Sequence, residues 1–280
     1  MKIRAIILSA LILCGISAVI MYSRAAQPQQ KSSVITQAIN DKNTPMVIKN
    51  LILKMKEQME VNDDQFPELI KEVENYTNSC ADSASVAVLH SMLAEMYQNY
   101  YQRNQWTINQ RTQLSGYIPE DIRVWTSNLF TDKIKEEIDL SLRPTALLQN
   151  TPVSKFKDIL EIGKDSQTLR PTLYEFLAFR ALDIQPTVQI YKDLIAFQNK
   201  EPNMKSVLLT ELDYLRFLYG DKRDKESFEA YMNALDELYR NLASQNYATE
   251  ILIAKLDLVS GSMFRYVSTA VSTAGRGYVW

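Results

Sequence analysis

The sequence predicts an all-α protein, and three observations lead to this fold class. Apolar residues recur with a helical period almost throughout the region from Val34 to Val259. Glycine is scarce there, because only Gly116, Gly163 and Gly220 occur, each near an expected helix boundary. No stretch alternates apolar and polar residues between turn dipeptides, as half-buried strands would.

Capping signals predict where several helices begin and end. Residues 44–45 and 151–152 are Thr-Pro pairs, which place a capping hydroxyl before a proline at the first helical position. Residues 172–175 have capping-box spacing. Gly163 and Gly220 are expected to end helices in the left-handed conformation. The predicted helices cover residues 33–42, 45–60, 66–78, 84–104, 119–125, 127–143, 145–150, 153–162, 172–183, 187–199, 204–219, 224–244 and 247–258.

Short connections between these helices favour packing as antiparallel hairpins. Hairpins of this size indicate a tetratricopeptide-like stack, and the lack of a clean 34-residue repeat makes it an irregular one. The long irregular stretch is about residues 104–119. The helix over 84–104 carries two adjacent apolar seams, one of which includes His90. Such a wide apolar arc predicts contact with more than one neighbouring helix.

The N-terminus has the pattern of an export segment. Lys2 and Arg4 precede an almost unbroken apolar run from Ala5 to Tyr22, and residues 23–25 offer small side chains at the −3 and −1 positions of a cleavage site. We favour cleavage, although the run is also just long enough for an uncleaved membrane anchor. Lipidation at Cys14 is disfavoured, because leucine precedes it where a small residue is expected.

Four segments are therefore expected. Residues 1–26 form a signal peptide or membrane anchor, and residues 27–33 form a polar linker. Residues 34–259 form the helical-repeat domain. Residues 260–280 are expected to form an irregular tail, non-native or truncated, because they lack acidic residues and a helical period and contain three glycines. The alternative is a genuine edge strand or tail. The chain is expected to be exported to the periplasm or cell envelope, with membrane contact only through residues 5–22 if they stay uncleaved.

Charge argues against nucleic acid as a partner. The chain has 31 basic and 33 acidic residues, a net charge of −2. Removal of residues 1–26 leaves 28 basic against 33 acidic residues, a net charge of −5. This balance suits a soluble domain and disfavours anionic membranes or polyphosphate ligands.

No catalytic, metal or cofactor site is predicted. His90 is the single histidine and lies in an apolar seam, where a hydrogen-bonded core histidine is favoured over a catalytic one. Cys80 has no partner for a disulfide after cleavage and cannot complete a zinc site with one histidine. The acidic pairs 63–64, 120–121 and 136–137 are expected to face solvent, since adjacent residues on a helix diverge by about 100°. A phosphate-binding loop and a dinucleotide fingerprint are both absent from the sequence.

A cluster of aromatic and arginine residues is the best candidate for a binding surface. Its side chains are suited to stacking on a glycan or a peptide. The same side chains are equally suited to pinning residues 104–119 onto the helices by cation–π and hydrogen-bond contacts, which is the role we favour. Arg170 and Arg180 allow the same two interpretations, with salt bridges as the structural one. The candidate binding face consists of Tyr97, Tyr101, Arg103, Trp106, Arg111, Tyr117, Arg123 and Trp125.

The patterns over residues 89–132 and 170–183 resemble the N-terminal helical region of large exported bacterial alpha-2-macroglobulin-like proteins. The resemblance implies that this chain is a fragment, the head of a protein that inhibits proteases by entrapment. It implies no trapping residue here, because Cys80 is followed by Ala-Asp-Ser and not by the thioester pattern.

Two functions are therefore expected. The first is a non-catalytic scaffold or docking module whose partners are other domains of a larger polypeptide, or envelope proteins. The second is an independent exported helical-repeat protein that binds a glycan or peptide through the aromatic–arginine face. An enzyme is the least favoured interpretation, and no cofactor is expected.

Overall fold

The fold is all-α, as predicted. The structure, a computed structural model, describes residues 35–39, 43–61, 65–112, 117–163, 166–200, 203–220, 224–242, 248–260 and 278–279. Within these ranges the regular structure is helical except for two strands of two residues each. None of the helices in the described ranges is long and apolar enough to cross a membrane. The predicted leader (1–26), the linker (27–33) and most of the tail (260–280) lie outside the described residues.

The chain divides into two compact units, residues 1–63 and 64–280. In the first unit, α2 spans Thr44–Val61. Asn43 caps this helix, because its Oδ1 accepts a hydrogen bond from the Met46 N–H at 3.2 Å. The prediction that Thr44 supplies the cap was therefore wrong by one residue, and Thr44 is the first helical residue.

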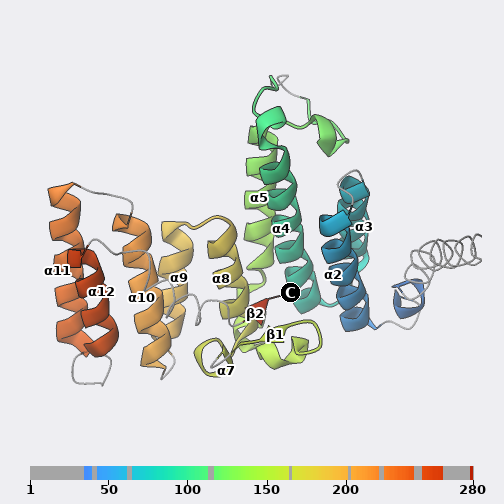
Figure 1. Cartoon of the computed structure of the whole chain (residues 1–280). Helices are drawn as coiled ribbons and strands as arrows, with labels where there is room; N and C mark the ends of the chain where they lie inside the picture. Colours follow the sequence, from blue (N-terminus) through green and yellow to red (C-terminus); the bar gives the residue numbers. More distant parts are fainter. Residues whose placement is uncertain are drawn as a thin grey trace, which may run out of the picture. The chain divides into compact units, whose positions relative to one another are not determined.

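The second unit contains the remaining elements (Figure 1). They are α3 (Phe66–Ser79), α4 (Ser83–Ile108), η2 (Ile122–Val124), α5 (Ser127–Ser141), α6 (Thr145–Asn150), η3 (Val153–Phe156), β1 (Glu161–Ile162), α7 (Ser166–Leu169), α8 (Leu173–Ile184), α9 (Val188–Gln198), α10 (Met204–Tyr219), α11 (Lys225–Leu242), α12 (Ala248–Ser260) and β2 (Tyr278–Val279).

Helix α4 is central to its part of this unit, because α3, α5 and α8 all pack against it. From α8 to α12 each helix packs against the next one in the chain (Figure 1). Helices α10 to α12 share one apolar core, in which Leu208, Leu235 and Ile251 are completely buried. The short helix α6 packs against α8 and so helps to position the region between α5 and α9.

Two predicted helices are absent. Residues 119–125 form only the 3-10 turn η2, because the Asp121 carboxylate accepts a hydrogen bond from the Arg123 N–H and holds a tight turn. Residues 153–162 form η3 and then β1. Around them, backbone hydrogen bonds run to the segment before α8, from Val153 N–H to the Pro171 carbonyl at 2.9 Å and from Leu173 N–H to the Thr151 carbonyl at 2.8 Å. These long-range partners replace the local bonds of a helix.

The expected start and stop signals had mixed outcomes. The capping box is confirmed, since the Thr172 hydroxyl and the Glu175 carboxylate each accept the other's backbone N–H. Thr151 is not a cap, because its hydroxyl donates back to the Leu147 carbonyl. Gly220 does end α10 but in the right-handed conformation, at φ −59°. An added Cβ would lie 2.5 Å from the Arg216 carbonyl oxygen, so close approach explains this glycine.

Gly163 differs from its prediction as well. It follows β1 and does not end a helix. Its carbonyl oxygen accepts hydrogen bonds from the Ser166 N–H at 3.3 Å and from the Ser166 hydroxyl at 2.6 Å. Gly163 therefore helps to start α7, a short helix that the sequence did not predict.

Candidate functional site

The structure brings part of the aromatic–arginine cluster together as a small buried core. The rings of Tyr97 and Trp125 stack with centroids 5.6 Å apart and planes 8° from parallel. Phe130 packs against both rings at 6.5 and 5.3 Å. The Trp125 indole N–H donates to the Pro119 carbonyl at 2.6 Å, and the Tyr97 hydroxyl donates to Glu74 at 2.7 Å. These contacts fix the connection that precedes α5 onto α4.

Arginines in the cluster also hold this connection in place. The Arg111 guanidinium donates to the Trp125 carbonyl at 2.7 Å. Arg123 pairs with Asp121 and with Glu68 on α3. The Tyr101 hydroxyl donates to Asn109. Hydrogen bonds, ion pairs and ring stacking thus engage Tyr97, Tyr101, Arg111, Arg123 and Trp125, five of the eight residues of the candidate face.

Trp106 and Tyr117 behave differently from the rest of the cluster. Their side chains are 79% and 60% exposed. Ile118 and Val124 are also more than half exposed. These side chains are available for contact with a partner. Neither of the described pockets is lined by them or by Arg103.

His90 is hydrogen-bonded, as predicted, and its side chain is partly buried, with 16% exposed. Its Nδ1 lies 2.7 Å from Oε2 of Glu137, a side chain that is 3% exposed. The Lys133 ammonium lies 2.8 Å from the other oxygen of the same carboxylate. The prediction that residues 136 and 137 both face solvent was wrong for Glu137, because the turn of about 100° between neighbours places it on the inward face of α5.

The remaining polar candidates hold the fold together. Arg180 pairs with Glu95 at 2.5 Å and donates from Nε to the Ser91 hydroxyl at 3.2 Å, which joins α8 to α4. The Arg170 guanidinium lies 3.5 Å from the centre of the Phe179 ring.

Cys80 is a free, partly exposed thiol. Among the described residues, no group of three or more His, Cys, Asp or Glu side chains is arranged to hold a metal ion.

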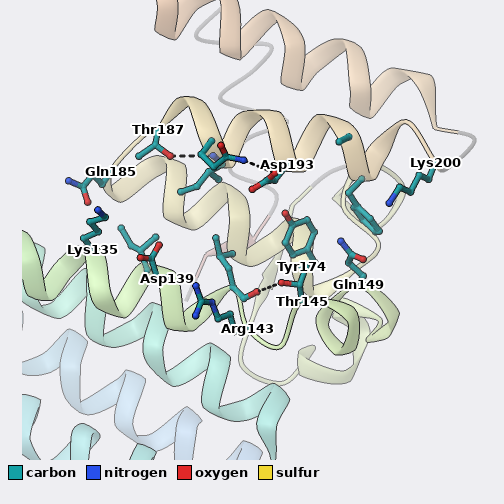
Figure 2. Close-up of a pocket in the computed structure, with 16 residues that line it drawn as sticks. Lys135, Asp139, Arg143, Thr145, Gln149, Tyr174, Gln185, Thr187, Asp193 and Lys200 are labelled. Atoms are coloured by element: carbon teal, nitrogen blue, oxygen red, sulfur yellow. Dashed lines mark hydrogen bonds between the residues drawn. The ribbon is translucent and has the colours of Figure 1, made fainter.

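A groove between α5 and α9 was not predicted. It has a volume of about 880 Å³ (Figure 2). Residues of α5 and α9 line the groove, together with residues of α6 and α8 and of the connections that follow α5, α8 and α9. The lining residues are Lys135, Ile138, Asp139, Leu142, Arg143, Thr145, Gln149, Tyr174, Gln185, Thr187, Gln189, Ile190, Asp193, Ala196, Phe197 and Lys200.

The floor of this groove is apolar and its rim is polar. Tyr174 and Phe197 are buried and meet edge to face, with ring centroids 5.2 Å apart. Ile138 and Ile190 are also buried and extend the apolar surface. Burial, with the Asp193 carboxylate nearby, raises the pKa of Tyr174 to about 12. Like an ordinary tyrosine, it is protonated at neutral pH and is able to donate a hydrogen bond.

The sequence contains only a partial signal for the groove. Lys135 and Asp139 are four residues apart, which places them on one face of α5, and Arg143 continues this spacing just beyond the end of the helix. Such a face is usually a solvated charged surface. This face lines a groove because it lies opposite α9, which is about 50 residues later in the chain. Local sequence patterns do not predict a contact over that distance.

No family model, no curated protein and no solved structure matches this chain. The likeness of residues 89–132 and 170–183 to alpha-2-macroglobulin-like proteins is therefore an expectation from the sequence patterns. The groove and the exposed surfaces are the features of the molecule that bear on its function.

Proposed function

We propose that this chain is a non-catalytic helical docking module that holds a segment of another polypeptide in the groove between α5 and α9. The groove itself carries the proposal. Its volume of about 880 Å³ lies within the range of protein ligand sites. An apolar floor with a polar rim between two helices suits a peptide, whose side chains need apolar contacts and whose backbone needs hydrogen bonds.

The helices form an irregular tetratricopeptide-like stack in this proposal. The sequential contacts from α8 to α12 support it, because each helix contacts mainly its neighbours in such an arrangement. Stacked helix pairs commonly present an extended surface for a partner. The described contacts of His90, Arg180 and the Tyr97–Trp125 pair supply rigidity for such a surface.

The resemblance to alpha-2-macroglobulin-like proteins supplies the context of the proposal. In that context the chain is the exported head of a protease-trapping protein in the periplasm or cell envelope. The docked segment then belongs to another domain of the same polypeptide or to an envelope protein. The leader pattern in residues 1–26 supports export.

A second candidate function is the binding of a glycan or peptide through the aromatic–arginine face. The high exposure of Trp106 and Tyr117 favours it. The buried stack of Tyr97 on Trp125 and the paired Arg123 weigh against it, because those side chains are already engaged. We therefore place the groove first.

A peptide-display selection against the full chain tests the proposal. The variant Ala196→Trp fills the groove from an exposed helical position. Ala146→Trp is the matched control, since Ala146 is exposed on α6 and does not line the groove. We expect selected peptides to lose binding to the first variant only. Equal binding to both variants would exclude the groove, and loss of binding on Trp106→Ala instead would favour the second function.

A further inference from the structure

We infer that the segment held between α5 and α9 is an amphipathic helix, whose apolar stripe of about two turns packs on the floor of the groove. This inference rests on the proposed docking function and names the conformation and the pattern of the docked segment. It follows from how α5 and α9 line the groove, from the hydrogen bonds that its polar side chains already make and from the mixed charges of its lining.

Helices α5 and α9 each contribute one face to the groove. Lys135, Ile138 and Asp139 lie on α5, and Leu142 continues their spacing at the cap of this helix. The lining residues of α9 are likewise separated by one, three or four positions (Figure 2). Residues three and four positions apart lie on one side of a helix, and helices pack against each other through such rows. The groove is therefore lined like a surface against which another helix packs.

The apolar side chains of the lining form a short row on each helix. Ile138 and Leu142 are four positions apart, and Ile190 and Phe197 are seven positions apart. At 1.5 Å per residue these rows extend about 6 and 11 Å along their helices. A helix with apolar residues at i, i+3 or i+4, and i+7 presents a stripe of this length. Ala196 is small and exposed, so a docked helix is able to approach α9 closely there.

Several polar side chains of the lining are already hydrogen-bonded within the protein. The Gln189 amide donates to Oδ1 of Asp193 at 2.8 Å. The Thr145 hydroxyl donates to the Leu142 carbonyl at 2.9 Å, and the Thr187 hydroxyl caps the start of α9. Backbone groups inside α5 and α9 are bonded within those helices. The lining therefore offers few groups to the backbone of another chain.

An extended segment would need such groups. Each of its residues carries a backbone N–H and a carbonyl, and extended segments usually find partners for them at the edge of a sheet. Neither of the two described strands lines the groove, and the remaining amides of the lining, Gln149 and Gln185, serve only a few backbone groups. A helix bonds its own backbone internally and needs only side-chain contacts. The lining therefore favours a helical segment over an extended one.

Charge in the lining selects neither an acidic nor a basic segment. The charged residues are three cations and two carboxylates, namely Lys135, Arg143, Lys200, Asp139 and Asp193. An amphipathic helix commonly carries charged residues of both signs beside its apolar stripe. We therefore expect the apolar stripe and the helical conformation, more than net charge, to determine binding.

Competitive peptide display against the full chain tests this inference. Two libraries have equal length and composition, and their apolar residues recur at i, i+4 and i+7 in the first and at i, i+2 and i+4 in the second. The remaining positions vary among Ala, Gln, Glu and Lys in both. Peptides that also bind the Ala196→Trp variant are removed. We expect the first library to be enriched at least about tenfold over the second, because its apolar residues share one face of a helix.

Proline then tests the helix in the tightest peptide that this selection yields. Proline at a central position outside the apolar stripe should weaken binding at least about tenfold, because it breaks the interior of a helix. Alanine at the same position is the matched control and should change the affinity by less than about twofold. Fluorescence anisotropy with labelled peptides measures both affinities.

The outcomes separate this inference from the docking function. Equal enrichment of both libraries, or enrichment of the second, with binding still blocked by Ala196→Trp, overturns the helical segment and leaves the docking groove intact. A proline peptide that binds as tightly as the alanine peptide also overturns it. Failure of both libraries to yield a peptide that distinguishes the wild type from Ala196→Trp overturns the groove as a docking site and the inference with it. Ala196 is exposed, and circular dichroism will verify that its variant keeps the fold.

Discussion

The Nδ1 atom of His90 lies 2.7 Å from Oε2 of Glu137 and joins α4 to α5 through a partly buried hydrogen bond. Lys133 reaches the other oxygen of the Glu137 carboxylate at 2.8 Å. Burial disfavours the charged form of Glu137. The hydrogen bonds from His90 and Lys133 outweigh this effect and lower the pKa of Glu137 below its ordinary value.

We predict that Glu137→Ala destabilises the protein by about 3 kcal/mol at pH 7, because it removes a buried carboxylate and leaves the partly buried His90 and Lys133 without it. Glu136→Ala is the matched control. Its carboxylate also contacts Lys133 but is 58% exposed, so its loss should cost less than about 1 kcal/mol. Urea unfolding followed by circular dichroism measures both. Equal losses would show that burial of Glu137 is not what matters.

The same carboxylate predicts a pH dependence. A carboxyl whose pKa is lower in the folded state contributes stability above its unfolded pKa, about 4.3 for glutamate. That stability disappears as the pH falls through the folded-state pKa. The difference in unfolding free energy between the wild type and Glu137→Gln should therefore be largest near neutral pH and shrink below about pH 4. A difference that grows toward acid would reverse the assigned sign.

The two tryptophans of the aromatic–arginine cluster should respond in opposite ways to truncation. Trp125 is 8% exposed and stacks on Tyr97, so Trp125→Ala should cost about 3–5 kcal/mol. Trp106 is 79% exposed, so Trp106→Ala should change stability by less than about 0.5 kcal/mol. Denaturant unfolding of the two variants checks this contrast. A large loss in Trp106→Ala would show that this ring is part of the fold.

Local patterns in the sequence predicted most of the helices well. Residues 172–183 were expected to be helical from their period and capping box, and α8 spans Leu173–Ile184. The helix over 84–104 was correctly expected to contact several neighbours, because its apolar arc is wide. Both signals act within a few turns of helix, where periodicity and capping determine the structure.

Features that depend on distant parts of the chain were not predicted. His90 was expected to be a core residue, but its partner Glu137 is 47 residues away. Residues 153–162 were expected to be a helix, but their neighbours bond to the segment before α8. The groove arises where α5 and α9 lie on either side of α8, an arrangement that tertiary structure alone sets. The exposed and buried members of the aromatic cluster were likewise indistinguishable by composition.

The ion pair between Glu95 on α4 and Arg180 on α8 gives a further prediction. Arg180 is 9% exposed and bonds to both Glu95 and Ser91. Glu95→Ala removes the carboxylate that contacts this buried guanidinium, while Asp183 still acts on it, and should cost about 3 kcal/mol. The double variant Glu95→Ala with Arg180→Met also removes the buried guanidinium charge and should recover part of the lost stability. Thermal unfolding of both variants measures this recovery. A double variant less stable than Glu95→Ala would show that the buried Arg180 charge is not the cause of the loss.

The C-terminal segment should contribute little to stability. Strand β2 pairs with β1 through two residue pairs, Glu161 with Val279 and Ile162 with Tyr278. A two-stranded pairing of this size is marginal in water, because few hydrogen bonds offset the entropy lost in ordering the chain. Ending the chain at Val259 should therefore lower the unfolding midpoint by less than about 5 °C. Calorimetry of the two chain lengths makes the comparison. A larger decrease would show that the β1–β2 pairing, or contacts beyond it, belongs to the folded core, and Tyr278→Pro in the longer chain would then tell these apart by removing a backbone donor from β2.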